Sequence, residues 1–145
     1  MKLEITQDEQ LKETEIRIRC ARMDEKMSAL VSAIRLLDNQ LTGTLNGETY
    51  LLDARDIFYI DTVDKCTFLY AEKLVYESQL RLYELEDRLH GSGFLRAGKS
   101  MLVNFNQIRS LRADFGGRMR LTMKNGELCL VSRQYVVTFK ERLGL

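Results

Sequence analysis

Residues 93–104 read Gly-Phe-Leu-Arg-Ala-Gly-Lys-Ser-Met-Leu-Val-Asn, and the structure that this stretch adopts decides the fold of the chain. Its first eight residues satisfy the phosphate-loop pattern G-x-x-x-x-G-K-S, with Gly93, Gly98, Lys99 and Ser100 at the defined positions. A phosphate loop requires a buried strand before it and a helix after it, so that backbone N–H groups point at the phosphates. The flanking sequence therefore tests this interpretation.

The two flanks have the opposite order. Residues 84–90, Glu-Leu-Glu-Asp-Arg-Leu-His, are charged and favour a helix, whereas residues 101–106 contain two Asn and lack a helical period. Only 45 residues follow Ser100, too few for the remaining βα units of a parallel sheet. The predicted order of helix, loop and strand argues against nucleotide binding. A nucleotide-binding switch at residues 93–100 is kept as an alternative function.

The bulk composition predicts a globular domain. A chain of 145 residues makes one domain, or one domain with a small extension, and it is 45% hydrophobic and 30% charged. No apolar run approaches the roughly 20 residues that a membrane helix needs, and the N-terminus alternates polar and apolar residues, unlike a signal peptide. We expect a cytoplasmic protein.

The cysteines and the one histidine suggest no catalytic or metal chemistry. Cys20, Cys66 and Cys129 are widely spaced and lack a CxxC pair, so we expect reduced cysteines that act as small hydrophobic residues. His90 stands near a predicted helix end without a Cys or His partner at ligand spacing, which favours a surface or capping role. Without a nucleophile–base pair, we predict neither an enzyme nor any cofactor or metal.

Charge is distributed unevenly along the chain. The formal net charge is +1, but residues 1–38 carry −1, residues 39–93 carry −5 and residues 94–145 carry +7. A segregated basic segment could neutralise the phosphates of a nucleic acid, or it could be a solvated basic face.

Hydrophobic periodicity divides the chain at about residue 40. Alternation at 3–5 and 15–20 predicts two strands, and an apolar period over 23–38 predicts an amphipathic helix. Residues 1–40 are therefore predicted to form a strand-strand-helix extension.

Residues 41–145 form the second predicted unit, which is mainly β (α+β) with antiparallel sheets. Its short internal helix is predicted near 80–89, and Ser132 is placed to N-cap a C-terminal helix. Strands are predicted at 41–45, 48–52, 57–61, 66–70, 74–76, 108–113, 119–123 and 127–131. No helix pair of helix-turn-helix type is predicted, so DNA would have to be contacted by loops that project from a sheet.

Several motifs of this unit, taken together, resemble the LytTR DNA-binding domain family of bacterial transcription regulators. They occur in order: Leu52-x-x-x-Asp56-Ile57-Phe58-Tyr59-Ile60-Asp61, Leu80-Arg81-Leu82-Tyr83-Glu84-Leu85-Glu86, Phe94-Leu95-Arg96-x-x-Lys99-Ser100-x-Leu102-Val103-Asn104-x-x-x-Ile108, Leu121-x-x-x-Asn125-Gly126 and Val131-Ser132-Arg133-x-Tyr135. The resemblance implies a β-rich fold whose loops enter successive major grooves, usually at directly repeated promoter sites.

By position, the resemblance implies three DNA-contacting segments: the loop after Asp61, the stretch around Lys99, and the start of the last helix. The DNA-binding candidates are Lys65, Cys66, Thr67, Arg96, Lys99, Ser100 and Arg133. Lysine and arginine can donate to guanine O6 and N7 or to phosphate, and hydroxyl groups can donate to phosphate. Asn104 is predicted to satisfy backbone groups instead.

Two departures from the family pattern bear on function. Gly98 stands where many members carry His, which removes a donor. Residues 1–40 are too short for a phosphoacceptor receiver domain and resemble the extension of stand-alone LytTR regulators. We predict a sequence-specific transcription regulator. The stripe Met27-Leu30-Ile34 is expected to mediate homodimerisation, at least on DNA. Alternatively, the stripe contacts a regulatory protein, which could be membrane-bound. An adaptor that has lost DNA binding is the other alternative.

Overall fold

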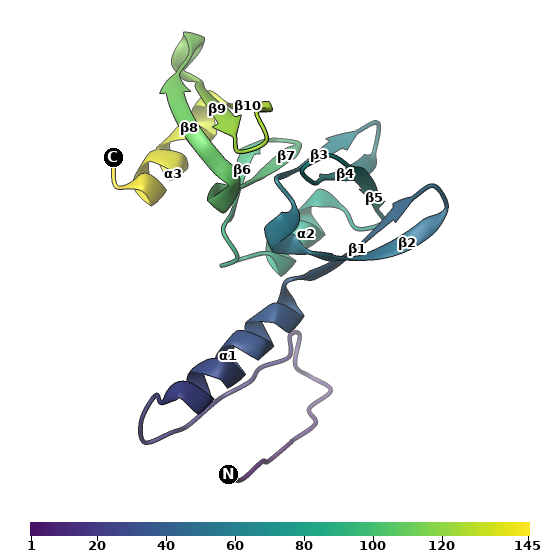
Figure 1. Cartoon of the computed structure of the whole chain (residues 1–145), viewed down its shortest axis with the longest axis vertical. Coiled ribbons are helices and arrows are strands. Elements are labelled where there is room, and N and C mark those ends of the chain that lie inside the picture. The colour runs from purple at the N-terminus through teal and green to yellow at the C-terminus, as the bar shows by residue number, and fades with distance from the viewer.

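The computed structural model describes the chain from Met1 to Leu145, apart from the side chains of residues 35, 36 and 38. Its helices are α1 (Glu25–Asp38), α2 (Leu82–Arg88) and α3 (Arg133–Leu143), as Figure 1 shows. Its strands are β1 (Gln40–Leu45), β2 (Glu48–Asp53), β3 (Tyr59–Val63), β4 (Cys66–Tyr70), β5 (Val75–Ser78), β6 (Phe94–Gly98), β7 (Met101–Asn104), β8 (Ile108–Ala113), β9 (Met119–Met123) and β10 (Leu128–Val131). Three 3₁₀ turns complete the chain: η1 (Ala54–Asp56), η2 (Phe105–Gln107) and η3 (Phe115–Gly117).

The strands form two antiparallel sheets, as the sequence predicts. The seven-stranded sheet has the order β2-β1-β5-β4-β3-β7-β6, and the three-stranded sheet has the order β10-β9-β8. All strand pairs are antiparallel. The helix predicted at 80–89 is present as α2, and the eight predicted strands have boundaries within a few residues of those predicted. β6 is an additional strand, because it lies where the sequence predicted a loop.

The hairpins follow from their turn residues. Asn46 and Gly47 both have positive φ (52° and 81°) between β1 and β2, the backbone that a two-residue hairpin of type I′ requires. Asp64 and Lys65 adopt the same conformation (50° and 66°) between β3 and β4. The loop predicted at 62–65 is therefore only these two residues, because β3 continues to Val63 and pairs with Cys66.

The large sheet separates two hydrophobic cores. On one face, Ile60, Leu69 and Leu102 pack with α2 through Leu85 and Leu89. On the other face, β6 and β7 pack with the three-stranded sheet and α3. That second core contains Phe58, Ala97, Val103, Met119, Leu121, Met123, Cys129, Val131, Val136 and Phe139. Leu102 of β7 lies in the first core and its neighbour Val103 lies in the second, because successive strand residues point to opposite faces of the sheet.

The last helix begins where the sequence places it. Ser132 occupies the N-cap position of α3, but its side chain makes no capping hydrogen bond. Val136 and Phe139 are buried against the three-stranded sheet, and Tyr135 is partly buried there. Gly144 ends the helix in the left-handed conformation (φ 72°) that favours glycine.

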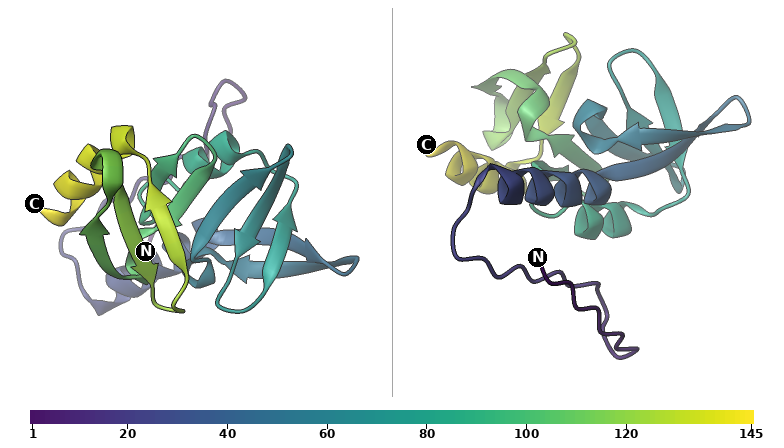
Figure 2. Two further views of the ribbon diagram at one scale, coloured as in Figure 1. Left: turned by 90° about the horizontal axis from the view of Figure 1, so that it is seen from above. Right: turned by 60° about the horizontal axis from the view of Figure 1, so that its bottom comes forward.

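The N-terminal arm, residues 1–38, differs from the prediction. The helix is present as α1, but residues 3–5 and 15–20 form no strands. The chain turns near Asp8, whose carbonyl accepts the Leu11 N–H, and doubles back, so that both segments run outside the sheets (Figure 2). Neither segment has a hydrogen-bonded partner strand, and an isolated two-stranded hairpin is only marginally stable in water.

The remaining predictions can be compared directly. Of the three free cysteines, Cys129 is buried as predicted, but Cys20 and Cys66 are exposed and do not pack as hydrophobic residues. His90 is exposed near the end of α2, as predicted. Within the described residues, no helix is long and apolar enough to cross a membrane, and no cluster of three potential metal ligands is present.

Candidate nucleic-acid interface

The β3–β4 hairpin presents the first predicted segment. Its positive-φ turn places Lys65 at the tip, and Lys65 and Cys66 are exposed. Thr67 is only 4% exposed and lies opposite Thr62 and Ser78 in the sheet register. Lys65 and Cys66 can therefore reach a ligand, whereas the Thr67 side chain faces the interior.

The β6–β7 hairpin presents the second segment. Lys99 and Ser100 form its turn and are exposed, and the register shifts between Arg96 and Gly98. Residues 94–98 and 101–104 are strands, so no helix follows the glycine loop. The phosphate-loop alternative is wrong because the helix N-terminus that would bind phosphate is missing at this place.

Arg96 is directed at its own hairpin and not at solvent. Its side chain is 24% exposed and forms an ion pair with Glu86 of α2 through Nε. Its Nη1 donates to the carbonyl oxygens of Lys99 (2.5 Å) and Gly98 (3.3 Å). Arg96 thus ties the turn that carries Lys99 and Ser100 to α2.

The third segment is the start of α3. Ser132 and Arg133 are exposed, and α3 packs beside β6. Because the first turn of a helix leaves backbone N–H groups without intrahelical partners, this end carries a partial positive charge that favours anionic groups. Arg133 adds a full positive charge at the same place.

Backbone hydrogen bonds join the three segments into one edge. The Thr62 N–H donates to the Ser100 carbonyl (2.9 Å), which links the first hairpin to the second. The Ser132 N–H donates to the Ala97 carbonyl (2.8 Å), which links the second hairpin to α3. We call this row of the β3–β4 turn, the β6–β7 turn and the start of α3 the loop edge.

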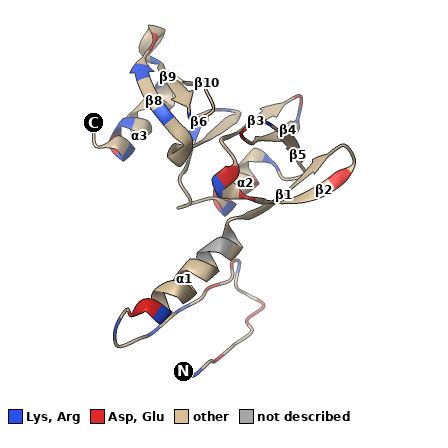
Figure 3. Cartoon of the chain, viewed as in Figure 1, with Lys and Arg blue, Asp and Glu red and all other residues tan. Residues whose placement is uncertain are grey.

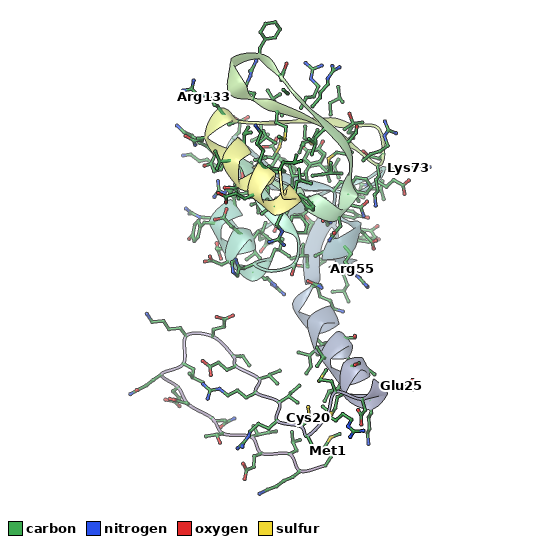
Figure 4. All side chains as sticks on the ribbon, turned by 90° about the vertical axis from the view of Figure 1, so that its left-hand side faces the viewer. Met1, Cys20, Glu25, Arg55, Lys73 and Arg133 are labelled. Atoms are coloured by element: carbon green, nitrogen blue, oxygen red, sulfur yellow. The ribbon has the colours of Figure 1, made fainter. Side chains whose placement is uncertain are left out.

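The loop edge lies away from the N-terminal arm. In Figure 4, Arg133 is at one end of the molecule, and Met1, Cys20 and Glu25 are at the other. In Figure 3, blue segments recur along β8 and α3 on the side of the molecule that carries the end of α3. The exposed basic residues of the edge are Lys65, Lys99 and Arg133, and the acidic Asp64 of the first turn partly offsets them.

The family model of the LytTr DNA-binding domain matches residues 47–144, which include all three segments. The chain belongs to the LytTR family. A solved LytTr DNA-binding domain of a protein described as a methyl-accepting/DNA response regulator from Bacillus cereus has a TM-score of 0.70 and 29% identity, over 74% of this chain and 98% of that domain.

Full-length relatives extend the similarity to the N-terminal arm. A protein of Staphylococcus aureus strain NCTC 8325 is 28% identical over all of this chain and 99% of its own length. Another, of strain MSSA476, is 30% identical over 92% of this chain and 93% of its own length. Both are named uncharacterized HTH-type transcriptional regulators. In this LytTR chain, β6 to β10 separate α2 from α3, so these two helices do not form a helix-turn-helix pair.

Two LytTR motif residues have structural roles. Asn104 is buried, its Nδ2 donates to the Ile57 carbonyl (2.9 Å) and its Oδ1 accepts the Asn106 N–H (3.1 Å), which confirms the backbone role predicted for it. Gly98 has no positive φ, and a Cβ there would lie 3.4 Å from Ser132 Oγ, an ordinary contact. The backbone therefore does not require glycine at this position.

The sequence did not identify one neighbour of the loop edge, the η3 turn. A Cβ at Gly117 of η3 would lie 2.9 Å from Arg133 Cδ, so the stem of Arg133 packs directly over this glycine. Asp114, just before η3, has a lowered pKa because the Phe115 backbone N–H donates to it and because Arg120, Arg118 and Arg112 are close, although burial opposes the shift. The run Asp-Phe-Gly-Gly was the available signal, but it reads as an ordinary turn.

Proposed function

We propose that this LytTR chain is a transcription regulator that binds specific promoter DNA through the loop edge, with its loops in successive major grooves. The observation that carries the proposal is the backbone connection of three segments, far apart in sequence, into one edge with Lys65, Lys99 and Arg133 exposed along it. The names of its relatives support the regulatory role.

Each exposed residue has a distinct chemical capacity. Arg133 has a planar guanidinium that can donate two parallel hydrogen bonds to guanine O6 and N7, and it stands at a helix end that favours phosphate. Lys99 can bind guanine or phosphate, and Ser100 can donate to phosphate. Lys65 and Cys66 form the distal contact, and Thr67 supports their hairpin from inside the sheet.

Arg96 has a different role in this proposal. Because its guanidinium is engaged with Glu86 and with two carbonyl oxygens of the turn, we assign it to positioning Lys99 and Ser100. Its contribution to DNA binding is therefore indirect. Rigid support of this kind matters because a contacting side chain must be held close to its productive geometry.

The N-terminal arm is proposed to mediate association. Leu30 is exposed on α1 and Met27 and Ile34 are partly buried, so the apolar stripe that they form is not fully buried by the rest of the chain. A second copy would bury it and would match directly repeated DNA sites; a regulatory protein, which could be membrane-bound, is the alternative occupant. A cytoplasmic location accompanies the proposal, since the promoter DNA is there.

The test is a titration of the protein with its own upstream DNA at two salt concentrations, with non-specific competitor present. We expect specific binding that weakens steeply with salt, because phosphate contacts release counterions. Arg133→Ala should weaken it by about ten- to a hundredfold, the range for a lost bidentate base contact. Arg142→Ala, an exposed arginine near the other end of α3, is the matched control and should bind like the wild type.

Two outcomes separate the parts of the proposal. Wild-type protein that binds its upstream DNA no better than competitor would contradict the regulator function. Specific binding that Arg133→Ala and Lys99→Ala both leave intact would contradict the loop edge as its site. Unfolding temperatures of the variants, measured alongside, show that each protein is folded.

A further inference from the structure

The tip of the β8–β9 hairpin continues the loop edge beyond Arg133. This tip, residues 114–118, is called the η3 loop. Gly117 lies under the Arg133 stem, so the η3 loop and the start of α3 are in direct contact. The order of elements along the edge is therefore the β3–β4 turn, the β6–β7 turn, the start of α3 and then the η3 loop.

The η3 loop presents an aromatic ring to solvent. Phe115 is 85% exposed, more than any other large apolar side chain of residues 39–145. Exposure of a whole phenyl ring forgoes the stabilisation that burial would give. A single exposed ring is common on protein surfaces, so Phe115 gains significance only together with the arginines beside it.

Glycine conformations and local hydrogen bonds shape the η3 loop. Gly116 and Gly117 have positive φ (68° and 77°), which glycine adopts without strain. The Asp114 N–H donates to the Arg118 carbonyl (2.9 Å), and Arg118 Nε donates to the Phe115 carbonyl (3.0 Å). These bonds hold Phe115 at the tip and keep Arg118 beside it.

The charge of the loop favours an anionic partner. Arg112 and Arg118 are exposed at the ends of the two strands, whereas Arg120 is engaged with Asp114 (Nη2–Oδ1 3.5 Å). Asp114 is the single acid of the loop, whereas Arg112, Arg118 and Arg120 all lie close to it, so the charge around the loop stays positive. With Arg133 adjacent, this end of the molecule combines positive charge with one flat apolar group.

From this arrangement we propose that the η3 loop is a fourth DNA-contacting segment, which binds the sugar–phosphate backbone next to the base pairs contacted by Arg133. Arg118 pairs with a phosphate, and the Phe115 ring packs against the neighbouring deoxyribose. The inference rests on the proposed function, because the loop is placed on DNA by its contact with Arg133. The contact of the η3 loop with the DNA backbone would set the length and position of the DNA site, and it would not select the base sequence.

The same features fit DNA better than a protein partner. A protein-docking surface needs a patch, but Phe115 is a single ring on a two-glycine turn, and its neighbours are arginines. A duplex that lies across the start of α3 would reach this turn because Arg133 and Gly117 touch. Binding of a second protein at Phe115 becomes one outcome of the test.

The test uses the full chain and the upstream DNA to which the wild type binds, in three variants: Arg118→Ala, Phe115→Ala and the control Arg109→Ala. Arg109 is an exposed arginine at the other end of β8, so it matches the charge change without touching the loop. The readouts are affinity at several salt concentrations and a hydroxyl-radical footprint of the DNA backbone. All three side chains are exposed, and unfolding temperatures check that the variants are folded.

Arg118→Ala should weaken binding by about two- to fivefold, as for loss of one exposed ion pair, and should lower the salt slope by about one. Phe115→Ala should weaken binding by about twofold with an unchanged salt slope, because it removes no charge. Both should lose protection of the backbone at one flank only. Trimming the duplex at that flank should abolish the difference between each variant and the wild type, and Arg109→Ala should behave as wild type throughout.

Failure of the inference differs from failure of the proposed function. If the wild type binds specifically and both loop variants match it in affinity, salt slope and footprint, the fourth contact is wrong and the regulator function stands. If Phe115→Ala changes the oligomeric state of the protein and not the footprint, the loop is a protein contact and the inference is wrong. Wild type without specific DNA binding would overturn both.

Discussion

Residues 15–20 and residues 66–70 were both predicted as short strands, yet only the second becomes a strand. β4 lies between β3 and β5, which pair with it on both sides, and Leu69 of its inner face is fully buried. In the N-terminal arm, Ile16 is 62% exposed and no strand pairs with its segment. The comparison teaches that a favourable local sequence permits a strand, whereas pairing with neighbouring strands and burial of one face stabilise it.

The same contrast extends to the whole arm and the remainder of the chain, residues 39–145, which we call the body. The body holds both hydrophobic cores, and no residue with a described side chain in residues 1–38 is buried. The arm should therefore contribute to association and the body to stability. Four predictions test this division, from the largest expected effect on stability to the smallest.

Removal of a buried aromatic side chain from the body should give the largest difference in stability from a substitution in the arm. Phe139→Ala should lower the free energy of unfolding by about 3–5 kcal/mol, because it deletes a fully buried ring of the second core and leaves a cavity. Ile16→Ala in the arm should change it by less than about 0.5 kcal/mol. Urea unfolding of both variants gives the comparison, and similar losses for the two would contradict the division.

The buried amide of Asn104 should give the next largest effect. Asn104→Ala removes the bonds to the Ile57 carbonyl and the Asn106 N–H, and a buried polar group left unpaired costs about 1–3 kcal/mol. Asn106→Ala is the matched control, since the Asn106 side chain is exposed, and it should change the free energy of unfolding by less than about 0.5 kcal/mol. If Asn104→Ala and Asn106→Ala lowered the urea midpoint equally, burial of the Asn104 amide would not explain the loss of stability.

Deleting residues 1–38 should leave the body folded, with its free energy of unfolding changed by less than about 1 kcal/mol at equal monomer concentration. The deletion must keep Asn39, whose carbonyl accepts the Ala54 N–H (2.7 Å) and whose Oδ1 accepts the Ser92 hydroxyl (2.8 Å).

Light scattering during size-exclusion chromatography should show that the shortened chain is monomeric at concentrations where the full chain associates. A full chain that is itself monomeric, with and without DNA, would count against dimerisation by the arm. Loss of folding on deletion would mean that α1 is part of the body.

The prediction for the cysteines involves the smallest effect on stability at pH 8. Burial raises the pKa of the Cys129 thiol to about 12, with smaller contributions from Glu127 and Asp61, whereas Cys20 and Cys66 are exposed. At pH 8 we expect a thiol reagent to modify Cys20 and Cys66 rapidly in the native protein, and Cys129 only after unfolding. The control Cys66→Ser should lower the number of rapidly modified thiols per chain by one. Rapid modification of all three thiols in the wild type would contradict the burial of Cys129.

The sign of the pH effect follows from the same shift. The unfolded thiol loses its proton near pH 8.5, whereas the folded thiol keeps it until about pH 12. Stability linked to Cys129 is therefore complete below the unfolded pKa and is lost as pH rises towards 12. Cys129→Ser should flatten this part of the stability curve.

The sequence predicted more of the body than of the arm. Turn pairs such as Asn46-Gly47 and the stripe of α3 depend on local conformational preferences, so the hairpins and the last helix were found with small errors. The strands at 3–5 and 15–20 were wrong because their formation needs a partner that the sequence does not supply within the chain. The cap bond of Ser132 was also wrong in detail, although the helix start was right.

The candidate site shows the same limit. The motif located the three segments that we propose contact DNA, but it could not separate exposed from engaged side chains within them. Thr67 and Arg96 carry the right chemistry, yet one is buried in the sheet and the other is bonded to Glu86 and its own turn. Solvent exposure depends on neighbours that are distant in sequence, so a local motif does not contain it.

By itself, then, the sequence determined the family, the antiparallel β architecture and the turns, because these depend on residue order and on backbone preferences between near neighbours. Only the tertiary structure decided that three loops form one edge, that Phe115 and Arg118 extend it past Arg133, and that the arm is left unpartnered. The physical reason is that hydrogen bonds such as Thr62 to Ser100 and Ser132 to Ala97 join residues whose proximity is created only by packing of the two cores.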